Sequence, residues 1–255
     1  KELESGEVRL KTSGMYRKLK SVFLHRNVTE RERVFHQVSE IPKEYRKQLI
    51  IDGKRTVEID ISSSNFVLLS GILRSENVNS QLPLDDWLER GKFYEEISKR
   101  VWGNKVDREI VKRLCMKFLD SKKGSRLGPT FDDLKKIDPT VTEKFKELRT
   151  FFQTQEPELF KFVEEQNHLR RPLPVGPGFQ SVGGLLYRLM MKEVEVVIEG
   201  IVGWCREQGV PVISIHDGVI VKQSDFRRFG LKKKFETIIR NRTGVRPFLK
   251  VVHGV

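Results

Sequence analysis

The chain has 255 residues, of which 38% are hydrophobic, so it is long enough to bury the core of one large domain or two small ones. Lys and Arg (48) outnumber Asp and Glu (35), which gives a formal net charge of +13 and an isoelectric point near 9.7. This balance disfavours a basic partner and favours a polyanion, with nucleic acid as the first candidate.

The cysteine count and the apolar runs exclude further classes of protein. Cys115 and Cys205 stand in segments of helical periodicity without zinc-site spacing, so we expect two core thiols in a reducing compartment. No apolar run approaches the ~20 residues of a membrane span, and no apolar stretch follows the basic N-terminus as in a secretory leader. We therefore expect a cytoplasmic protein. The start at Lys1 rather than Met is consistent with a fragment of a longer one.

In chain order, the sequence predicts a charged helical part, a pair of strands, a block of helices and a second strand-containing part. Pro42 interrupts the first helical pattern, and the Asp52-Gly53 step predicts a hairpin turn within residues 49–60. Helical spacing after Asp60 predicts a helix, whereas residues 74–91 have the composition of a polar loop. The predicted helices cover 15–24, a segment after Thr29, 66–73, 93–102, 106–119, 142–152, 158–166, 180–207 and 226–240, and residues 247–252 form the last predicted strand.

Two short apolar segments are each followed by or contain an Asp residue. Residues 212–221 read VISIHDGVIV, where β-branched segments flank His216-Asp217-Gly218 and predict a hairpin. The strand predicted at 57–61 contains Asp60, and three serines follow it. Two strands that bring one Asp each to the same sheet edge suit a two-metal phosphoryl-transfer site, because Mg²⁺ prefers carboxylate oxygens. Alternatively, Asp217 only forms a turn and Asp60 only caps the next helix.

Arg108 and Lys112 lie four residues apart on the helix predicted at 106–119, so both cations project from the same side of it. The apolar residues of this segment recur on another face, which we expect to be buried. A pair of this kind is usually part of a solvated charged surface. That interpretation stays open beside a role in binding phosphate.

The order of these features resembles the polymerase core of family A DNA polymerases, and more closely the reduced versions found in phages and mobile elements. The resemblance extends from about Arg33 to Val255. VEIDISS resembles the first acidic motif, and GKFYEEISKRVWGNKVDREIVKR resembles the approach to the fingers and their main helix. NHLRRPLP and GFQSVGGLLYR resemble the basic turn and the palm helix that follow, SIHDGVIV the His-Asp motif, and PFLKVV the last palm strand.

The resemblance implies an α+β fold, with a palm of antiparallel sheet and packed helices, small helical fingers, and a thumb that is rudimentary or absent. It divides the chain into an N-terminal helical region at 1–48, which serves as thumb or tether, palm segments at 49–84 and 171–255, and a fingers-like insertion at 85–170. This leaves no room for a proofreading domain. We therefore expect low processivity without a separate replication factor or a fused domain.

By the same resemblance, Asp60, Asp217 and the backbone carbonyl of Ile61 bind two Mg²⁺ ions, for which Mn²⁺ can substitute. Arg108 and Lys112 bind the incoming nucleoside triphosphate, and Lys112 can also donate a proton to the leaving group. The residues expected at the template–primer DNA are Arg33, Arg46, Arg171, Gln180 and His216.

Several positions depart from the family pattern. Met116 and Asp120 stand where an aromatic pair follows the Lys of the fingers helix. Gly218 replaces the Glu that usually follows His-Asp, as in single-subunit RNA polymerases. Asn65, a nucleotide-binding candidate, replaces the Glu that blocks a ribose 2′-hydroxyl. The preference between dNTPs and rNTPs therefore stays open.

The leading hypothesis is a small template-dependent DNA polymerase of a bacterial or phage-infected cell. The alternatives are an RNA polymerase, primase or terminal transferase on the same fold, and a non-catalytic nucleic-acid-binding module. The presence of both Asp60 and Asp217 disfavours the module, because paired acids repel a phosphate backbone unless a cation lies between them. A two-metal nuclease is disfavoured because such sites use more than two acids, and no third acid stands in a comparable strand.

Overall fold

The computed structural model describes residues 8–9, 38, 41–80, 82–103, 106–121, 126–169, 171–172, 181–182 and 184–254. The chain divides into two compact units. Lys1–Ser64 and Met191–Val255 form the first, called the sheet unit, and Asn65–Met190 form the second, called the helical unit. The helical unit is thus an insertion between the two segments of the sheet unit.

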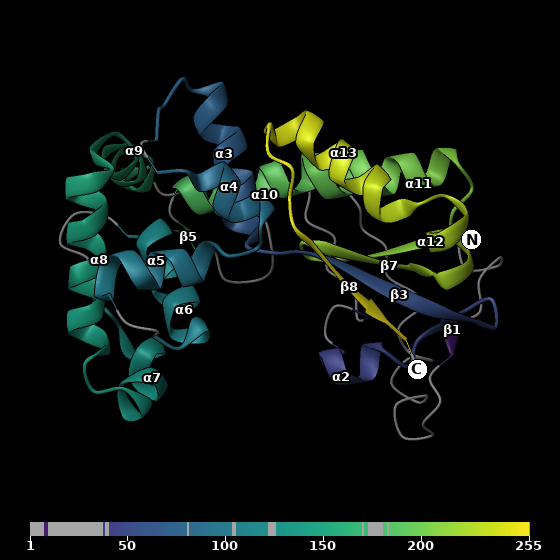
Figure 1. The fold of residues 1–255 in the computed structure, drawn as a ribbon, viewed down its shortest axis with the longest axis horizontal. Coiled ribbons are helices and arrows are strands. Elements are labelled where there is room, and N and C mark those ends of the chain that lie inside the picture. The colour runs from purple at the N-terminus through teal and green to yellow at the C-terminus, as the bar shows by residue number, and fades with distance from the viewer. Residues whose placement is uncertain are drawn as a thin grey trace. The chain divides into compact units, whose positions relative to one another are not determined.

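The sheet unit contains an antiparallel sheet whose central strand is β3 (Lys54–Ile61). β7 (Gly218–Lys222) pairs with one edge of β3, and β8 (Leu249–His253) pairs with the other (Figure 1). β6 (Val212–Ile215) lies outside β7. β2 (Ile50–Ile51) pairs with the start of β3 and with β1 (Val8–Arg9). The expected combination of helices and antiparallel sheet is confirmed.

Both hairpins expected from Asp-Gly steps are present. Asp52 and Gly53, with φ angles of 49° and 70°, form the turn between β2 and β3, as in the left-handed turns that suit twisted hairpins. The second hairpin joins β6 to β7, but its turn has two residues, His216 and Asp217. Gly218 is already the first residue of β7, because it pairs with Ile215.

Alternation along β3 separates an apolar face from a charged one. Val57, Ile59 and Ile61 are buried on one side of the strand. The helices α12 (Gln223–Arg228) and α13 (Leu231–Thr243) lie along that side, and the short helix α2 (Lys43–Arg46) lies on the other (Figure 1).

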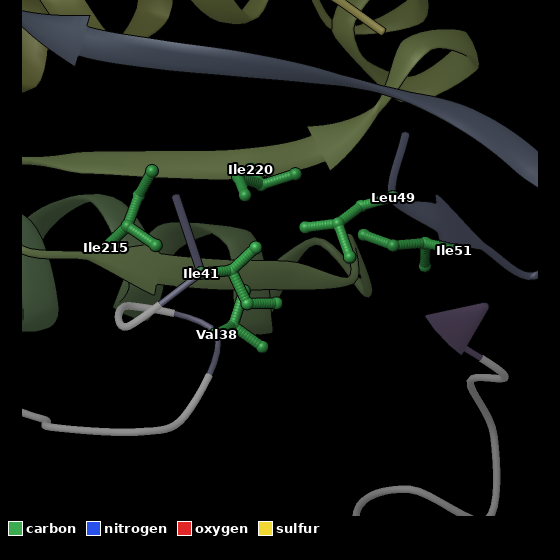
Figure 2. Packing of buried hydrophobic residues seen from close by; sticks show 6 residues of the cluster. All are labelled: Val38, Ile41, Leu49, Ile51, Ile215 and Ile220. Carbon is green, nitrogen blue, oxygen red and sulfur yellow. The ribbon is translucent and has the colours of Figure 1, made fainter. Parts of the chain in front are cut away.

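The face that carries α2 has an apolar cluster of its own. Ile220 of β7, which stands opposite Glu58 of β3, is a member of this cluster. Figure 2 shows that its other members come from the hairpin strand β6 and from the segment that precedes β3. The cluster consists of Val38, Ile41, Leu49, Ile51, Ile215 and Ile220. This packing fixes the approach of α2 to the charged face of β3.

Two predicted helices differ in detail from those observed. The segment predicted at 180–207 is helical from residue 184 onward, as α10 (Gly184–Glu193), the wider π-type helix η3 (Val194–Val202) and α11 (Gly203–Glu207). The single helix predicted at 226–240 is wrong, because the chain breaks into α12 and α13 at Gly230, whose φ is 56°. A left-handed residue of this kind ends one helix before the next begins.

The helical unit packs around two aromatic groups. The rings of Phe66 and Phe93 lie 4.0 Å apart between their centroids, and those of Phe118 and Phe152 stack at 4.2 Å. Its elements are α3 (Ser64–Ser75), α4 (Leu84–Glu89), α5 (Phe93–Trp102), α6 (Arg108–Leu119), η2 (Pro129–Phe131), α7 (Asp132–Ile137), α8 (Val141–Gln155), α9 (Pro157–His168), β4 (Arg171–Pro172), β5 (Ser181–Val182) and the part of α10 up to Met190.

The prediction of a polar loop at 74–91 is wrong for its second half, which forms α4. Leu84, Trp87 and Leu88 recur at helical spacing and are buried, and this apolar stripe stabilises a short helix within an otherwise acidic segment. The helices predicted at 15–24 and after Thr29 lie outside the described residues. In the part of the chain that the structure describes, no helix is long and apolar enough to cross a membrane.

Candidate active site

The two acids named from the sequence meet at one end of the sheet. Asp60 is near the end of β3 and stands opposite Gly218, the residue directly after Asp217. The backbone N–H of Ile61 donates to the backbone carbonyl of Asp217 at 3.2 Å, which ties the β6–β7 turn to the strand end. Residues 157 positions apart in sequence are thus held next to each other by strand pairing.

The electrostatics of Asp60 reflect this proximity. Burial raises the pKa of its carboxyl from an ordinary 3.8 to about 6, and the charge of Asp217 contributes in the same direction. Lys43 opposes the shift through its charge and a hydrogen bond. Two carboxylates that repel each other in this way attract a cation, because a cation between them removes the repulsion.

A third acid, missed by the sequence reasoning, lies on the same face of β3. Glu58 is two residues before Asp60, and strand alternation puts both on one side. Its side chain is only 6% exposed and accepts hydrogen bonds from Arg46 Nε and Nη2, at 3.2 and 3.1 Å. The two-residue spacing between Glu58 and Asp60 on a predicted strand could have indicated this from the sequence. Arg46 holds Glu58 in an ion pair. Among the described residues, no group of three or more Asp, Glu, His or Cys side chains is arranged to hold a metal ion.

Lys43 links Glu58 to Asp60. Its ammonium lies 3.4 Å from Glu58 Oε1 and 3.4 Å from Asp60 Oδ2. Arg46 also donates to the backbone carbonyl of Ile41 at 3.3 Å. The charges of Arg46, Glu58, Lys43 and Asp60 therefore alternate in sign across the charged face of β3. The expected contact of Arg46 with DNA phosphates stays a prediction.

Gly218 has a geometric role in this arrangement. A Cβ atom at this position would lie 2.7 Å from the backbone oxygen of Ile59 and 3.2 Å from the Cα of Asp60. Real Cβ atoms do not approach backbone this closely, so only glycine permits the observed pairing of β7 with β3. This gives a physical reason for the departure at Gly218, because a Glu at this register would need the two strands to separate.

His216 is the first residue of the turn and has a φ of 47°. His adopts the left-handed region more readily than β-branched or bulky residues do. This conformation places Asp217 directly before the first residue of β7. A DNA contact for His216 stays a prediction.

The helical unit carries the other nucleotide-binding candidates on α6. The helix begins at Arg108, and the Asp107 side chain caps it by accepting from the backbone N–H groups of Glu109 and Ile110. Arg108 pairs with Glu95 at 3.3 Å, and its guanidinium lies 5.1 Å from the ring centroid of Tyr94. The predicted buried face of α6 is confirmed, with Ile110, Val111, Leu114, Cys115, Phe118 and Leu119 buried.

Lys112 is exposed and has no ion-pair partner among the described residues. Met116 follows one turn later, and its sulfur accepts a hydrogen bond from the Asn65 side-chain amide at 3.2 Å. Arg108, Lys112 and Met116 form one row along the helix. The structure thus joins Asn65 to Met116, one of the positions at which the sequence departs from the family A pattern.

The remaining candidates are Arg171, Arg33 and Gln180. Arg171 lies in β4, whose backbone pairs with β5. Arg33 and Gln180 lie outside the residues that the structure describes. Their expected contacts with template–primer DNA stay predictions.

The raised pKa of Asp60 predicts a pH-dependent stability. Between about pH 4 and about pH 6 the folded state binds this proton more tightly than the unfolded chain does, so stability from this group falls as pH rises. The free energy of unfolding should fall by about 2–3 kcal/mol over this range. Asp60→Asn has no carboxyl to titrate and should not show this fall. In urea unfolding, the free energy of unfolding of the variant relative to the wild type should therefore rise by that amount between about pH 4 and about pH 7. A difference that does not change with pH would contradict the burial of this carboxyl.

No family model matches the chain, and no curated protein matches it. Among solved structures, the fold is similar to the POL domain of Pol1 from M. smegmatis, solved in complex with DNA primer-template and dNTP. The two chains share 12% sequence identity, with a TM-score of 0.50, over 85% of this chain and 44% of that one. This likeness concerns the fold, and the chain spans less than half the length of that polymerase.

Proposed function

We propose that the protein is a template-dependent nucleotidyltransferase that extends a DNA primer by phosphoryl transfer. The observation that carries the proposal is the meeting of Asp60 and Asp217 at one end of an antiparallel sheet, on a fold similar to that of a DNA polymerase domain. The charge of +13 supports a nucleic-acid partner. In this proposal residues 49–84 and 171–255 serve as the palm, residues 85–170 as the fingers, and residues 1–48 as a thumb or tether.

Two carboxylates and one backbone carbonyl are a donor set that suits Mg²⁺, which keeps several waters and completes its shell with substrate phosphates. In this proposal Asp60, Asp217 and the Ile61 carbonyl hold two such ions. When bound, the ions supply a lowered pKa for the primer 3′-hydroxyl and charge stabilisation for the phosphates. The role of the protein is to hold both carboxylates in place, through the β3–β7 pairing and the Ile61–Asp217 hydrogen bond.

The substrate contacts in the proposal follow the row on α6. Arg108 and Lys112 bind the triphosphate, and Lys112, as an exposed ammonium one turn from Arg108, can donate a proton to the departing pyrophosphate. Asn65 and Met116 line the position of the sugar and base, where a thioether and an amide replace the aromatic stacking of the family.

The DNA contacts in the proposal involve Arg33, Arg46, Arg171, Gln180 and His216. Phosphate contacts by cations position a duplex without reading its sequence. A small polymerase of this type would depend on a separate replication factor or a fused domain for processivity.

A nuclease is the second candidate. The sequence disfavoured it for lack of a third acid in a comparable strand, and the position of Glu58 removes that objection in part. A third acid does lie on the same strand face as Asp60. Its bidentate pair with Arg46 keeps it from acting as a ligand, so we retain nucleotidyl transfer as the better explanation.

The proposal is tested by primer extension with the purified chain and Mg²⁺. Parallel reactions with dNTPs or rNTPs, and with or without template, separate DNA synthesis from RNA synthesis and from terminal transfer. We expect dNTP incorporation that follows the template sequence. The absence of incorporation under every combination, including Mn²⁺, would reject the proposal. Shortening of the labelled primer would instead indicate a nuclease.

A further inference from the structure

The ammonium of Lys43 lies against one oxygen of the Asp60 carboxylate. It lies 3.4 Å from Asp60 Oδ2 and donates a hydrogen bond to that oxygen. Asp60 is the carboxylate to which the proposed function assigns a metal ion, and a carboxylate oxygen held by an ammonium is a poorer ligand for a second cation. Lys43 and a divalent cation bound to Asp60 would therefore compete for the negative charge of the same carboxylate.

The partners of Lys43 differ in mobility. The Lys43 side chain is 43% exposed and extends from a helix of only four residues, so it can change rotamer at little cost. Glu58 is 6% exposed and is held by two hydrogen bonds from Arg46, which is itself only 14% exposed. Glu58 is thus a fixed second acceptor, 3.4 Å from the same ammonium.

We propose that Lys43 is a built-in counter-ion that pairs with Asp60 before a divalent cation binds and is displaced onto Glu58 when the cation arrives. The inference rests on the proposed function only in taking Asp60 and Asp217 as the cation ligands. In the absence of a divalent cation, Lys43 compensates part of the charge of two neighbouring carboxylates. Glu58 keeps the displaced ammonium paired, so that no charge is left without a partner when the ion binds.

This arrangement predicts opposite effects for two substitutions. Lys43→Met removes the competing cation, so a divalent ion should bind more tightly. Glu58→Gln removes the negative charge of the second acceptor, so Asp60 is left as the only anionic partner of Lys43 among the described residues, and a divalent ion should bind more weakly. Lys47→Met is the matched control, because Lys47 ends the same helix, is exposed, and has no ion-pair partner among the described residues.

The test is direct titration of Mn²⁺, followed by electron paramagnetic resonance of the free ion, at about pH 8, where carboxylates are ionised. Sites that persist in the Asp60→Asn/Asp217→Asn double variant are subtracted. We expect Lys43→Met to bind Mn²⁺ about three to ten times more tightly than the wild type, and Lys47→Met to stay within about twofold. Lys43→Arg, which keeps the charge, should resemble the wild type.

Equal shifts in Lys43→Met and Lys47→Met would show an effect of net charge alone and would overturn the inference. No shift in Lys43→Met would also overturn it. Circular dichroism checks that Glu58→Gln is folded, and if it is not, the comparison of the three lysine variants decides by itself. The predicted shifts without any primer extension would uphold the role of Lys43 and reject the polymerase function, so the two proposals can fail separately.

Discussion

Asp217→Asn is expected to lower the rate of primer extension by about a thousandfold or more, and Asp60→Asn should do the same. Each substitution keeps the size of the side chain and removes the charge that holds a divalent cation at the end of the sheet. A thousandfold loss corresponds to about 4 kcal/mol of transition-state stabilisation, within the range that metal ions supply in phosphoryl transfer. Single-turnover extension of a labelled primer measures it.

The matched control for this prediction is Asp52→Asn. Asp52 stands in the turn at the other end of β3, and Asn tolerates its φ of 49°. Its pair with Lys222 at 3.3 Å is exposed, so little is lost with the charge. All three variants should bind primer–template DNA at least as tightly as the wild type, as measured by fluorescence anisotropy. Synthesis by Asp217→Asn at a tenth of the wild-type rate would contradict the catalytic assignment.

Gly218→Ala is expected to reduce synthesis by about a hundredfold and to destabilise the protein by about 1–3 kcal/mol. The added Cβ would lie 2.7 Å from the Ile59 carbonyl oxygen, so β7 must move away from β3 at the register of Asp60. Because Asp217 directly precedes Gly218, the movement separates the two carboxylates. Thermal unfolding and single-turnover extension measure the two effects.

Gly203→Ala serves as the control for the glycine substitution. Its Cβ would meet only the Ile198 carbonyl oxygen at an ordinary 3.7 Å, and the position is helical. This variant should be as stable as the wild type or slightly more so, with unchanged synthesis. If Gly218→Ala were equally harmless, the close approach of β7 to β3 would be wrong. Gly218→Glu should lower synthesis and stability as Gly218→Ala does, although family A polymerases carry Glu after His-Asp.

The sequence was informative where local periodicity decides the structure. Asp60 and Asp217 could be placed at the ends of strands because β-branched segments alternate around them and turn residues follow. The buried face of α6 could be read from its apolar spacing, and this is also why Arg108 and Lys112 were expected on its surface. Such features depend on a few neighbouring residues, which the sequence shows directly.

The charge network around Asp60 could be predicted only in part, because it depends on contacts between separate segments. Alternation puts Glu58 and Asp60 on one face of β3, but the pairing of Glu58 with Arg46 depends on where α2 packs. The position of α2 in turn follows from the apolar cluster that contains Ile41 and Ile220. The same limit applies to Gly218, since the need for glycine arises from the backbone of a strand more than 150 residues earlier.

The error at α4 has a similar origin. Its acidic residues, Asp85 and Asp86, suggested a loop, but acids in the first turn of a helix interact favourably with the helix dipole. The burial of Trp87 supplies the packing that a six-residue helix needs. Composition alone therefore underestimated a helix that tertiary contacts stabilise.

The proposed catalysis depends most on Asp60 and Asp217 holding divalent cations jointly. A crystal structure of the chain soaked with Mn²⁺, primer–template DNA and a non-hydrolysable nucleotide tests it directly through anomalous scattering. We expect manganese within about 2.0–2.3 Å of carboxylate oxygens from both residues, with Lys43 turned toward Glu58. Manganese bound elsewhere, with the two carboxylates facing different surfaces, would contradict it.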